Sequence, residues 1–462
     1  MEKPAVADDD LCAIFVHAGA GFHSRDNEIN HLRVCELALE SGMSFLRHGG
    51  SAISAVEMAL MVLEDAPITN AGLGSNLNEK GIIECDASIV DHFGRSGAVG
   101  AVPNVKNPIH LARRIYEKSY RSPGMSRVPP NFLCGEGATD FAWDNNVVVV
   151  PNDVLISPVA GERYKNWVAE IKGWQREHPQ SQEEIKAQSI RHPISIAPGH
   201  PDVVEKVMAA RQLFGDRVED RERSNIYDGK DSDEAQNVQS NDTPASPGVK
   251  NKSSGSSQSA PPSDTASSNR KPRLDGDDWI TDTVGAIAVD KYGNIAAGSS
   301  SGGIGMKHRG RIGPAALIGI GTHVIPVDPT DPNETTVAVV CSGTGEHIAT
   351  TFAASTCATR VYYGHKKTHA GFFDKVNEEE AIAAMLKDEF AGHPSVVNSD
   401  IESSIGLMAV KMTKQGIALI FAHNTDSFAL GAFSNKDSKA QCLMSRNKNK
   451  SPVAQGGIMI RK

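Results

Sequence analysis

The sequence has little of what marks a secreted, metal-binding or membrane protein. Its 462 residues include seven cysteines, an odd number. The cysteines are scattered and form no Cys-x-x-Cys pair, so neither a disulfide framework nor a zinc site is indicated. No apolar run approaches the length of a membrane-spanning helix, and the first ten residues are acidic, unlike a secretory signal. We therefore expect a cytosolic or nuclear protein that is not secreted, has no membrane partner and needs no metal or organic cofactor.

Positive charge is also in short supply. The net charge of −9 and the isoelectric point near 6.0 give no electrostatic footprint for direct nucleic-acid binding. Arg270-Lys271-Pro272-Arg273 resembles a weak nuclear-import signal, although so few charges fit a solvated stretch equally well. A soluble protein that meets its substrate through a local site is the better expectation.

One long segment lacks the apolar residues needed for a core. From about residue 215 to residue 279 the chain is rich in Ser, Asp, Asn, Lys and Pro. Such a composition cannot bury enough apolar surface to offset chain entropy, so it predicts a flexible tether. The chain before the tether is expected to be ordered to about residue 214.

Hydrophobic spacing predicts helices and strands on both sides of the tether. Helices are expected over 29–47, 52–64, 107–116, 138–143, 342–363 and 378–390. Strands are expected over 11–16, 82–90, 97–102, 284–289, 295–299, 336–341, 405–412, 417–423 and 426–433. The two groups of strands with helices favour a layered α+β fold.

The composition changes abruptly at Asp282 and Thr283. Thr283 begins the apolar run 284–289, where a threonine is by itself an ordinary β-branched strand residue. If the bond before Thr283 were broken, the same residue would carry a hydroxyl and a free α-amine. The ordinary pKa of such an amine, about 7.7–8.0, allows it to act as a base near neutral pH. One residue would then supply both nucleophile and base.

Two other polar segments are candidates for a site. Asn70 lies in a glycine-rich loop, and its side-chain amide could donate to a substrate carbonyl or an oxyanion. The segment 342–346 opens a helix whose N-terminus could face an anion. In the strand 82–90, by contrast, Glu84, Asp86 and Ser88 alternate with apolar residues, which is the pattern of a solvent-facing polar edge.

Several motifs taken in order resemble the plant-type asparaginase family of N-terminal nucleophile hydrolases. They are His17-Ala18-Gly19-Ala20-Gly21, Thr69-Asn70-Ala71-Gly72, Asp282-Thr283-Val284-Gly285, Ser300-Ser301-Gly302-Gly303, Gly310-Arg311-Ile312-Gly313 and Ser342-Gly343-Thr344-Gly345-Glu346. Within the family, the segments 73–78, 83–88 and 135–138, together with Lys307-His308, are similar to the threonine aspartase (taspase) branch. That branch comprises endopeptidases that cut proteins after aspartate.

The resemblance implies a four-layer αββα sandwich and self-cleavage between Asp282 and Thr283. Residues 1–282 would become an α subunit and residues 283–462 a β subunit, together one domain, and two such units would pair as (αβ)2. By position, Thr283 matches the nucleophile and Ser301 a supporting hydroxyl. Arg311 matches the arginine that grips the substrate carboxylate, with Gly19 also at the substrate. The groups expected around the scissile carbonyl and its oxyanion are Asn70, Ser342 and Gly343.

One departure from the family pattern bears on the substrate. Asparaginases with a Gly-Arg-Ile-Gly-Asp motif use its aspartate to hold the α-amine of a small substrate, whereas this chain has Pro314. The loss of that anchor favours a threonine endopeptidase acting on proteins with an internal aspartate, which the resemblance suggests are nuclear regulators. The alternative is an asparaginase, isoaspartyl peptidase or glycosylasparaginase acting on small amides. A third possibility is an inactive scaffold that binds acidic segments through Arg309 and Arg311.

Overall fold

The structure is a computed structural model that describes residues 11–178, 283–447 and 451–462. The chain divides into one unit of residues 1–172 and 273–462 and a second unit of residues 173–272. Both large sheets lie in the first unit. The expected tether, the expected ordered stretch 179–214 and Asp282 all lie outside the described residues.

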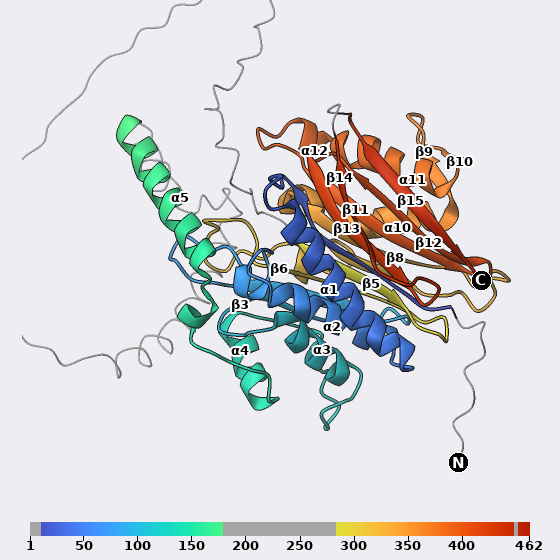
Figure 1. Cartoon of the computed structure of the whole chain (residues 1–462), viewed down its shortest axis with the longest axis horizontal. Coiled ribbons are helices and arrows are strands. Elements are labelled where there is room, and N and C mark those ends of the chain that lie inside the picture. The colour runs from blue at the N-terminus through green and yellow to red at the C-terminus, as the bar shows by residue number, and fades with distance from the viewer. Residues whose placement is uncertain (1–10, 179–282, 448–450) are drawn as a thin grey trace, which may run out of the picture. The chain divides into compact units, whose positions relative to one another are not determined.

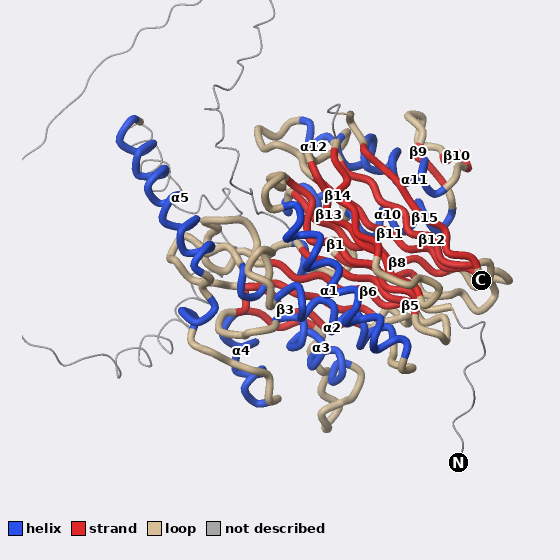
Figure 2. Tube along the Cα trace, viewed as in Figure 1, coloured by secondary structure: helices blue, strands red, loops and turns tan. Residues whose placement is uncertain are grey.

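The helices that the structure describes are α1 Glu28–Arg47, α2 Ala52–Glu64, α3 Pro108–Ser119, α4 Gly135–Asp144, α5 Pro158–Glu177, α9 Gly345–Thr350, α10 Ala353–Tyr363, α11 Glu378–Ala384 and α12 Pro394–Val397. The strands are β1 Ala13–Gly21, β2 Cys85–Val90, β3 Ser96–Val102, β4 Phe132–Cys134, β5 Val284–Val289, β6 Ile295–Ser301, β7 Thr322–Ile325, β8 Thr336–Gly343, β9 His365–Lys367, β10 Phe373–Lys375, β11 Ile405–Thr413, β12 Gly416–His423, β13 Ser427–Ser434, β14 Gln441–Arg446 and β15 Ala454–Arg461. The mixture of helices and strands confirms the α+β class (Figure 2).

The described strands form two large sheets and one two-stranded ribbon. The eight-stranded sheet has the order β14-β13-β1-β5-β6-β2-β3-β4, and the five-stranded sheet has the order β15-β12-β11-β8-β7. In the larger sheet β5 lies between β1 and β6, antiparallel to both. Strands from before and after residue 282 therefore share one sheet, and the strand that follows Thr283 is at its centre.

Three apolar clusters show how the layers pack. One joins α1, α2 and α3 to one face of the eight-stranded sheet. A second lies between the two sheets and includes side chains of β1, β5, β8 and β11. A third joins the outer face of the five-stranded sheet to α10 and α11. The order is thus helices, sheet, sheet, helices, and Figure 1 shows α1 to α3 and α10 to α11 on opposite sides of the strands.

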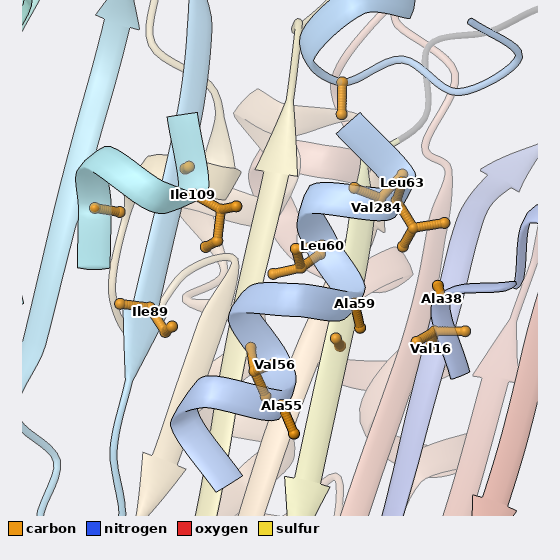
Figure 3. Packing of buried hydrophobic residues seen from close by; sticks show 14 of the residues in the cluster. Val16, Ala38, Ala55, Val56, Ala59, Leu60, Leu63, Ile89, Ile109 and Val284 are labelled. Carbon is orange, nitrogen blue, oxygen red and sulfur yellow. The ribbon is translucent and has the colours of Figure 1, made fainter. Parts of the chain in front are cut away.

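Helix α2 fixes the back of the central strands. Ser51 caps its N-terminus by accepting a hydrogen bond from the amide of Ser54. Figure 3 shows Leu60 and Leu63 of this helix directed onto the sheet, with Leu63 beside Val284. Val284 is fully buried. The residue that follows Thr283 is therefore anchored on the helix side of the sheet, which leaves Thr283 to face the other sheet.

Several elements differ from the sequence-based expectation. The helix expected over 342–363 begins only at Gly345, because Ser342 and Gly343 still belong to β8. It is also broken, because Phe352 adopts a left-handed conformation with φ of 50° between α9 and α10. The expected strand 426–433 exists as β13 but pairs with β1, so the chain crosses to the other sheet after β12. Helix α5 and strands β14 and β15 were not predicted. No helix in the described ranges is both long and apolar enough to span a bilayer.

Candidate active site

Thr283 lies at the start of β5, opposite the end of β6. The antiparallel register pairs Val284 with Ser300, so the next pair in line is Thr283 with Ser301. Thr283 is 5% exposed and Ser301 is 3% exposed. The Oγ of Ser301 accepts a hydrogen bond of 3.0 Å from the amide of Gly303. Two hydroxyl residues predicted for the site are thus neighbours on one face of the sheet.

Ser342 links this face to the second sheet. Its Oγ accepts hydrogen bonds from the backbone N of Thr283 at 3.2 Å and from the backbone N of Ala20 at 3.1 Å. Ser342 is 1% exposed and lies on β8. It therefore joins three strands, β1, β5 and β8, at the nitrogen atom that a chain break would convert into an amine.

Gly343 follows Ser342 in a conformation that only glycine accommodates. Its φ is 140°, and a Cβ built there would lie 2.1 Å from the carbonyl oxygen of Ser404. Gly19 occupies a similar bend with φ of 109°, at the bulge in β1 between His17 and Ala20. Because the amide of Ala20 bonds to Ser342, Gly19 is one residue from the site.

Asn70 is buried and its side chain is already engaged. Its Nδ2 donates to the carbonyl oxygen of Gly303 at 2.8 Å, and its Oδ1 accepts from the amide of Asn76 at 2.9 Å. Its backbone oxygen accepts from the amide of Gly302. In this structure Asn70 shapes the turn after Ser301, and one hydrogen of its side-chain amide remains for a ligand.

Arg311 reaches the same turn from the loop after β6. A Cβ on Gly303 would lie 3.2 Å from the Nη1 of Arg311, and a Cβ on Gly345 would lie 2.4 Å from its Nη2. Arg311 therefore contacts both the segment after Ser301 and the segment after Ser342. Its Nε and Nη2 each donate to Glu346, both at 3.0 Å.

The expectation that Glu84, Asp86 and Ser88 face solvent is wrong. These residues are 5%, 0% and 0% exposed. The strand β2 lies between β6 and β3 in the larger sheet and is covered on both faces. Its alternation of polar and apolar residues therefore does not mark a solvent-exposed face. Glu84 and Asp86 instead contact the loop that carries Arg311.

The carboxylates of Glu84 and Asp86 hold the backbone on either side of Arg311. Glu84 Oε2 accepts from the amide of Gly310 at 3.0 Å, and Asp86 Oδ2 accepts from the amide of Gly313 at 2.8 Å. Asp86 Oδ1 also accepts from the amide of Ala101 at 2.8 Å. Burial raises the pKa of Asp86, and nearby Lys307 and the two amide hydrogen bonds oppose the rise.

Lys307 anchors the beginning of the same loop. Its side chain is 2% exposed, and its Nζ donates to the backbone oxygen of Glu84 at 2.7 Å. Sequence reasoning assigned no role to Lys307, Glu84 or Asp86. A charged side chain in the middle of an apolar strand is the signal that would have found the two acids, because buried charges need partners.

His17 is buried between the sheets, close to Thr283. The space above Gly285 is filled by this ring, whose Nε2 would lie 2.3 Å from a Cβ built on that glycine. Burial lowers the pKa of His17 to about 3, while a backbone contact with Thr283 works in the opposite direction. His17 is therefore neutral at physiological pH, as are Ser301 and Ser342 beside Thr283.

No cluster of three or more metal-ligating side chains occurs in the described ranges. The acids near Arg311 accept backbone amides or pair with arginine, so they bear no resemblance to an open metal site. The arrangement combines a buried threonine with a hydroxyl group, neutral hydrogen-bonding groups and a cationic arm. That set suits hydrolysis of an amide bond near a carboxylate.

Comparison with known proteins agrees with this chemistry. A profile of the family described as asparaginase matches residues 11–383. An isoaspartyl peptidase of Salmonella typhimurium is 27% identical over 357 residues, which cover 76% of this chain and 79% of that protein. A probable isoaspartyl peptidase/L-asparaginase 2 of Arabidopsis thaliana is 29% identical over 401 residues, 84% of this chain and 90% of that protein.

A shorter match has higher identity. An isoaspartyl peptidase/L-asparaginase of Xenopus laevis is 41% identical over 160 residues, which are 34% of this chain and 48% of that protein. The names of these three relatives refer to isoaspartyl peptides and asparagine, which fits the small-amide alternative better than the endopeptidase interpretation. The family profile spans most of the described residues, including Thr283 and Arg311. This chain belongs to the asparaginase family of N-terminal nucleophile hydrolases.

Proposed function

We propose that this protein is a self-processing threonine hydrolase that cleaves an amide bond at an aspartyl group. The observation that carries the proposal is the position of Thr283, which is buried at the start of a central strand with its nitrogen bonded to Ser342. Ser301 and Arg311 lie close by on adjoining segments. The αββα sandwich of the N-terminal nucleophile hydrolases accounts for this layout.

In the first step, the hydroxyl of Thr283 attacks the carbonyl carbon of Asp282. The C–N bond between the two residues breaks, the nitrogen takes up a proton, and an ester joins Asp282 to the Thr283 oxygen. Water then hydrolyses the ester, leaving a carboxylate on Asp282 and a free amine on Thr283. The products are an α subunit of residues 1–282 and a β subunit of residues 283–462.

Turnover uses the new amine as the base for the hydroxyl of the same residue. The hydroxyl attacks the substrate carbonyl, and the Ser342–Gly343 turn and the remaining amide hydrogen of Asn70 stabilise the oxyanion. The leaving amine departs with a proton, and water hydrolyses the acyl-enzyme. Arg311 holds the carboxylate of the substrate, because its planar guanidinium can form two parallel hydrogen bonds with a carboxylate.

For the substrate, we propose a protein segment cut after aspartate. Pro314 packs against Gly345 beside Arg311, with its Cδ 2.8 Å from the position of a Cβ on that glycine. It supplies no charge at the point where a small amino-acid substrate would need a partner for its α-amine. A peptide that continues through the site has no free α-amine at this point, so the missing negative charge does not weaken its binding.

A small-amide activity is the second candidate, and two observations favour it. The relatives are named for isoaspartyl peptides and asparagine. In addition, Glu346 places a carboxylate next to Arg311, where it could receive the α-amine that Pro314 cannot.

The two substrate classes can be separated with purified, self-cleaved protein. β-Aspartyl dipeptides and L-asparagine are compared with a peptide of about ten residues that contains one internal aspartate. We expect the long peptide to have the higher kcat/KM and to be cut on the carboxyl side of the aspartate. Faster turnover of the dipeptides, with no cut in the long peptide, would assign the small-amide activity instead.

A further inference from the structure

The cationic arm of the site is occupied by a carboxylate of the protein itself. Arg311 donates from Nε to Glu346 Oε1 and from Nη2 to Glu346 Oε2, both at 3.0 Å. This two-bond arrangement is the one by which an arginine recognises a carboxylate ligand. Glu346 thus imitates the group that the proposed function assigns to the substrate.

The two partners differ in their contact with solvent. The side chain of Arg311 is 15% exposed and that of Glu346 is 56% exposed. Glu346 therefore covers the outer edge of a mostly buried guanidinium. Because the Glu346 side chain is largely exposed, its carboxylate is readily hydrated when it leaves, and an incoming carboxylate keeps the mostly buried guanidinium paired.

The inner side of Arg311 is held differently. A Cβ on Gly313 would lie 2.7 Å from Arg311 Nη1 and 3.1 Å from Asp86 Oδ2, so this nitrogen and the buried acid both lie beside Gly313. Asp86 is itself fixed by the amides of Ala101 and Gly313. In the part of the chain that the structure describes, Glu346 is the carboxylate within salt-bridge distance of Arg311. The outer edge, formed by Nε and Nη2, is the one open to exchange.

We propose that Glu346 is an internal competitor for the substrate carboxylate and so sets the specificity of the arm. This proposal rests on the proposed function, in which Arg311 binds the substrate carboxylate. When the site is empty, Glu346 pairs with Arg311; when an aspartyl substrate enters, its carboxylate takes the same two donors and Glu346 turns to solvent. Since Glu346 is tethered beside Arg311, its effective concentration is high, and a ligand with a carboxylate alone binds weakly.

The competition would select for ligands with further contacts. A free dicarboxylate must displace Glu346 with no other gain, whereas a longer substrate adds contacts along the chain. Helix α9 places Glu346 only three residues after Gly343, so the competitor lies next to the group proposed to stabilise the oxyanion. The exchange of carboxylates at Arg311 therefore takes place next to the reacting carbonyl.

The test is direct binding of N-acetyl-L-aspartate, measured by isothermal titration calorimetry. The acetyl group blocks the amine, so that only the contest for Arg311 is measured. We expect Glu346→Gln and Glu346→Ala to bind this probe about threefold tighter than the wild type, in line with the small net strength of an exposed pair. Arg311→Gln should bind at least about tenfold more weakly, because the charge-assisted bonds are lost.

Glu389→Gln is the matched control. Glu389 forms the same two-bond pair with Arg360, at 2.7 Å for each bond, between α10 and the π-helical turn Met385–Ala391. The Glu389→Gln variant should bind the probe as the wild type does. Equal or weaker binding by both Glu346 variants would overturn the proposal, as would undiminished binding by Arg311→Gln. Absence of any aspartyl hydrolysis by the wild type would instead refute the proposed function, while the binding comparison would still report on Glu346.

Discussion

The two ends of the candidate site are built on opposite principles. Around Thr283, the neighbours are neutral: Ser301, Ser342 and a histidine whose pKa is lowered to about 3 by burial. Around Arg311, the neighbours are charged and the outer partner, Glu346, is largely exposed. A low-polarity surrounding strengthens a few fixed hydrogen bonds, whereas a wet rim allows one ion pair to replace another.

The difference suggests a division of labour. The Thr283 end is fixed by bonds between strands, which suits a reaction that requires one geometry. The Arg311 end is held from below by Glu84 and Asp86 and is exchangeable at its outer edge. Substitutions at the first end should therefore affect the chemical step, and substitutions at the second should affect which substrates bind.

The largest effect is expected at the nucleophile. Thr283→Ala removes the attacking hydroxyl and should abolish both self-cleavage and turnover, seen as one full-length band on a denaturing gel and no product by mass spectrometry. Thr283→Ser is the matched control, because it keeps the hydroxyl and should retain slower cleavage. Substrate turnover by Thr283→Ala would show that Thr283 is not the nucleophile. The proposed difference between the Thr283 end and the Arg311 end of the site would then no longer hold.

A smaller loss is expected at the arm. Arg311→Lys keeps the charge but cannot form two parallel bonds, so kcat/KM for an aspartyl substrate should fall by about ten- to a hundredfold. The loss should appear mainly in KM, and self-cleaved protein should still accumulate. An unchanged KM with a reduced kcat would place Arg311 with the chemical groups instead.

Asp86→Asn tests the support beneath the arm. An amide can accept from one of the two backbone groups only, which leaves a buried donor poorly paired at a cost of about 1–3 kcal/mol in folding free energy. We expect KM to rise about tenfold with little change in kcat. Asp91→Asn is the control: Asp91 is 2% exposed and accepts the amides of Phe93 and Arg95 at the far end of β2. It should lower the melting temperature without raising KM.

The smallest effect on turnover is expected at a buried acid on the helix side of the sheet. Burial raises the pKa of Glu64 from 4.5 to about 8, although its Oε1 accepts from Ser300 Oγ at 2.6 Å. The folded protein therefore binds a proton that the unfolded chain releases near pH 4.5. Stability must fall as the pH rises through that interval, by up to about 1.4 kcal/mol per pH unit.

Thermal melts of the wild type and Glu64→Gln should reveal this dependence. The wild-type melting temperature should fall between pH 4.5 and about pH 8 relative to that of the variant, while kcat of the variant should match that of the wild type when both are measured at the same pH. Parallel curves for the two proteins would show that Glu64 does not titrate in this way.

Much of the fold follows from local patterns in the sequence. The helix 29–47 and the capped helix 52–64 were predicted within a residue or two, since apolar spacing and Ser51 leave few alternatives. Apolar runs likewise predicted the strands that precede and follow residue 282 in the sequence. By contrast, the residues of β14 and β15 are exposed or half-buried apart from Met444, so their sequences carry little periodic signal.

The site was predictable only in part. The seam before Thr283 could be found because composition changes there. Glu84 and Asp86 could have been noticed as charges in an apolar run, but the contacts that they and Lys307 make could not be predicted. Those contacts depend on β2 being covered on both faces, which is a property of the assembled sheet. The pairing of Arg311 with Glu346 joins positions 35 residues apart and has no local signature.

The most direct test of the account is the state of the bond before Thr283 in active protein. Mass spectrometry and N-terminal sequencing of purified wild-type material should find two chains, residues 1–282 and 283–462, the second beginning at Thr283. Activity should rise in step with the amount of this second chain. Active protein in which the bond between Asp282 and Thr283 is intact would contradict the central claim.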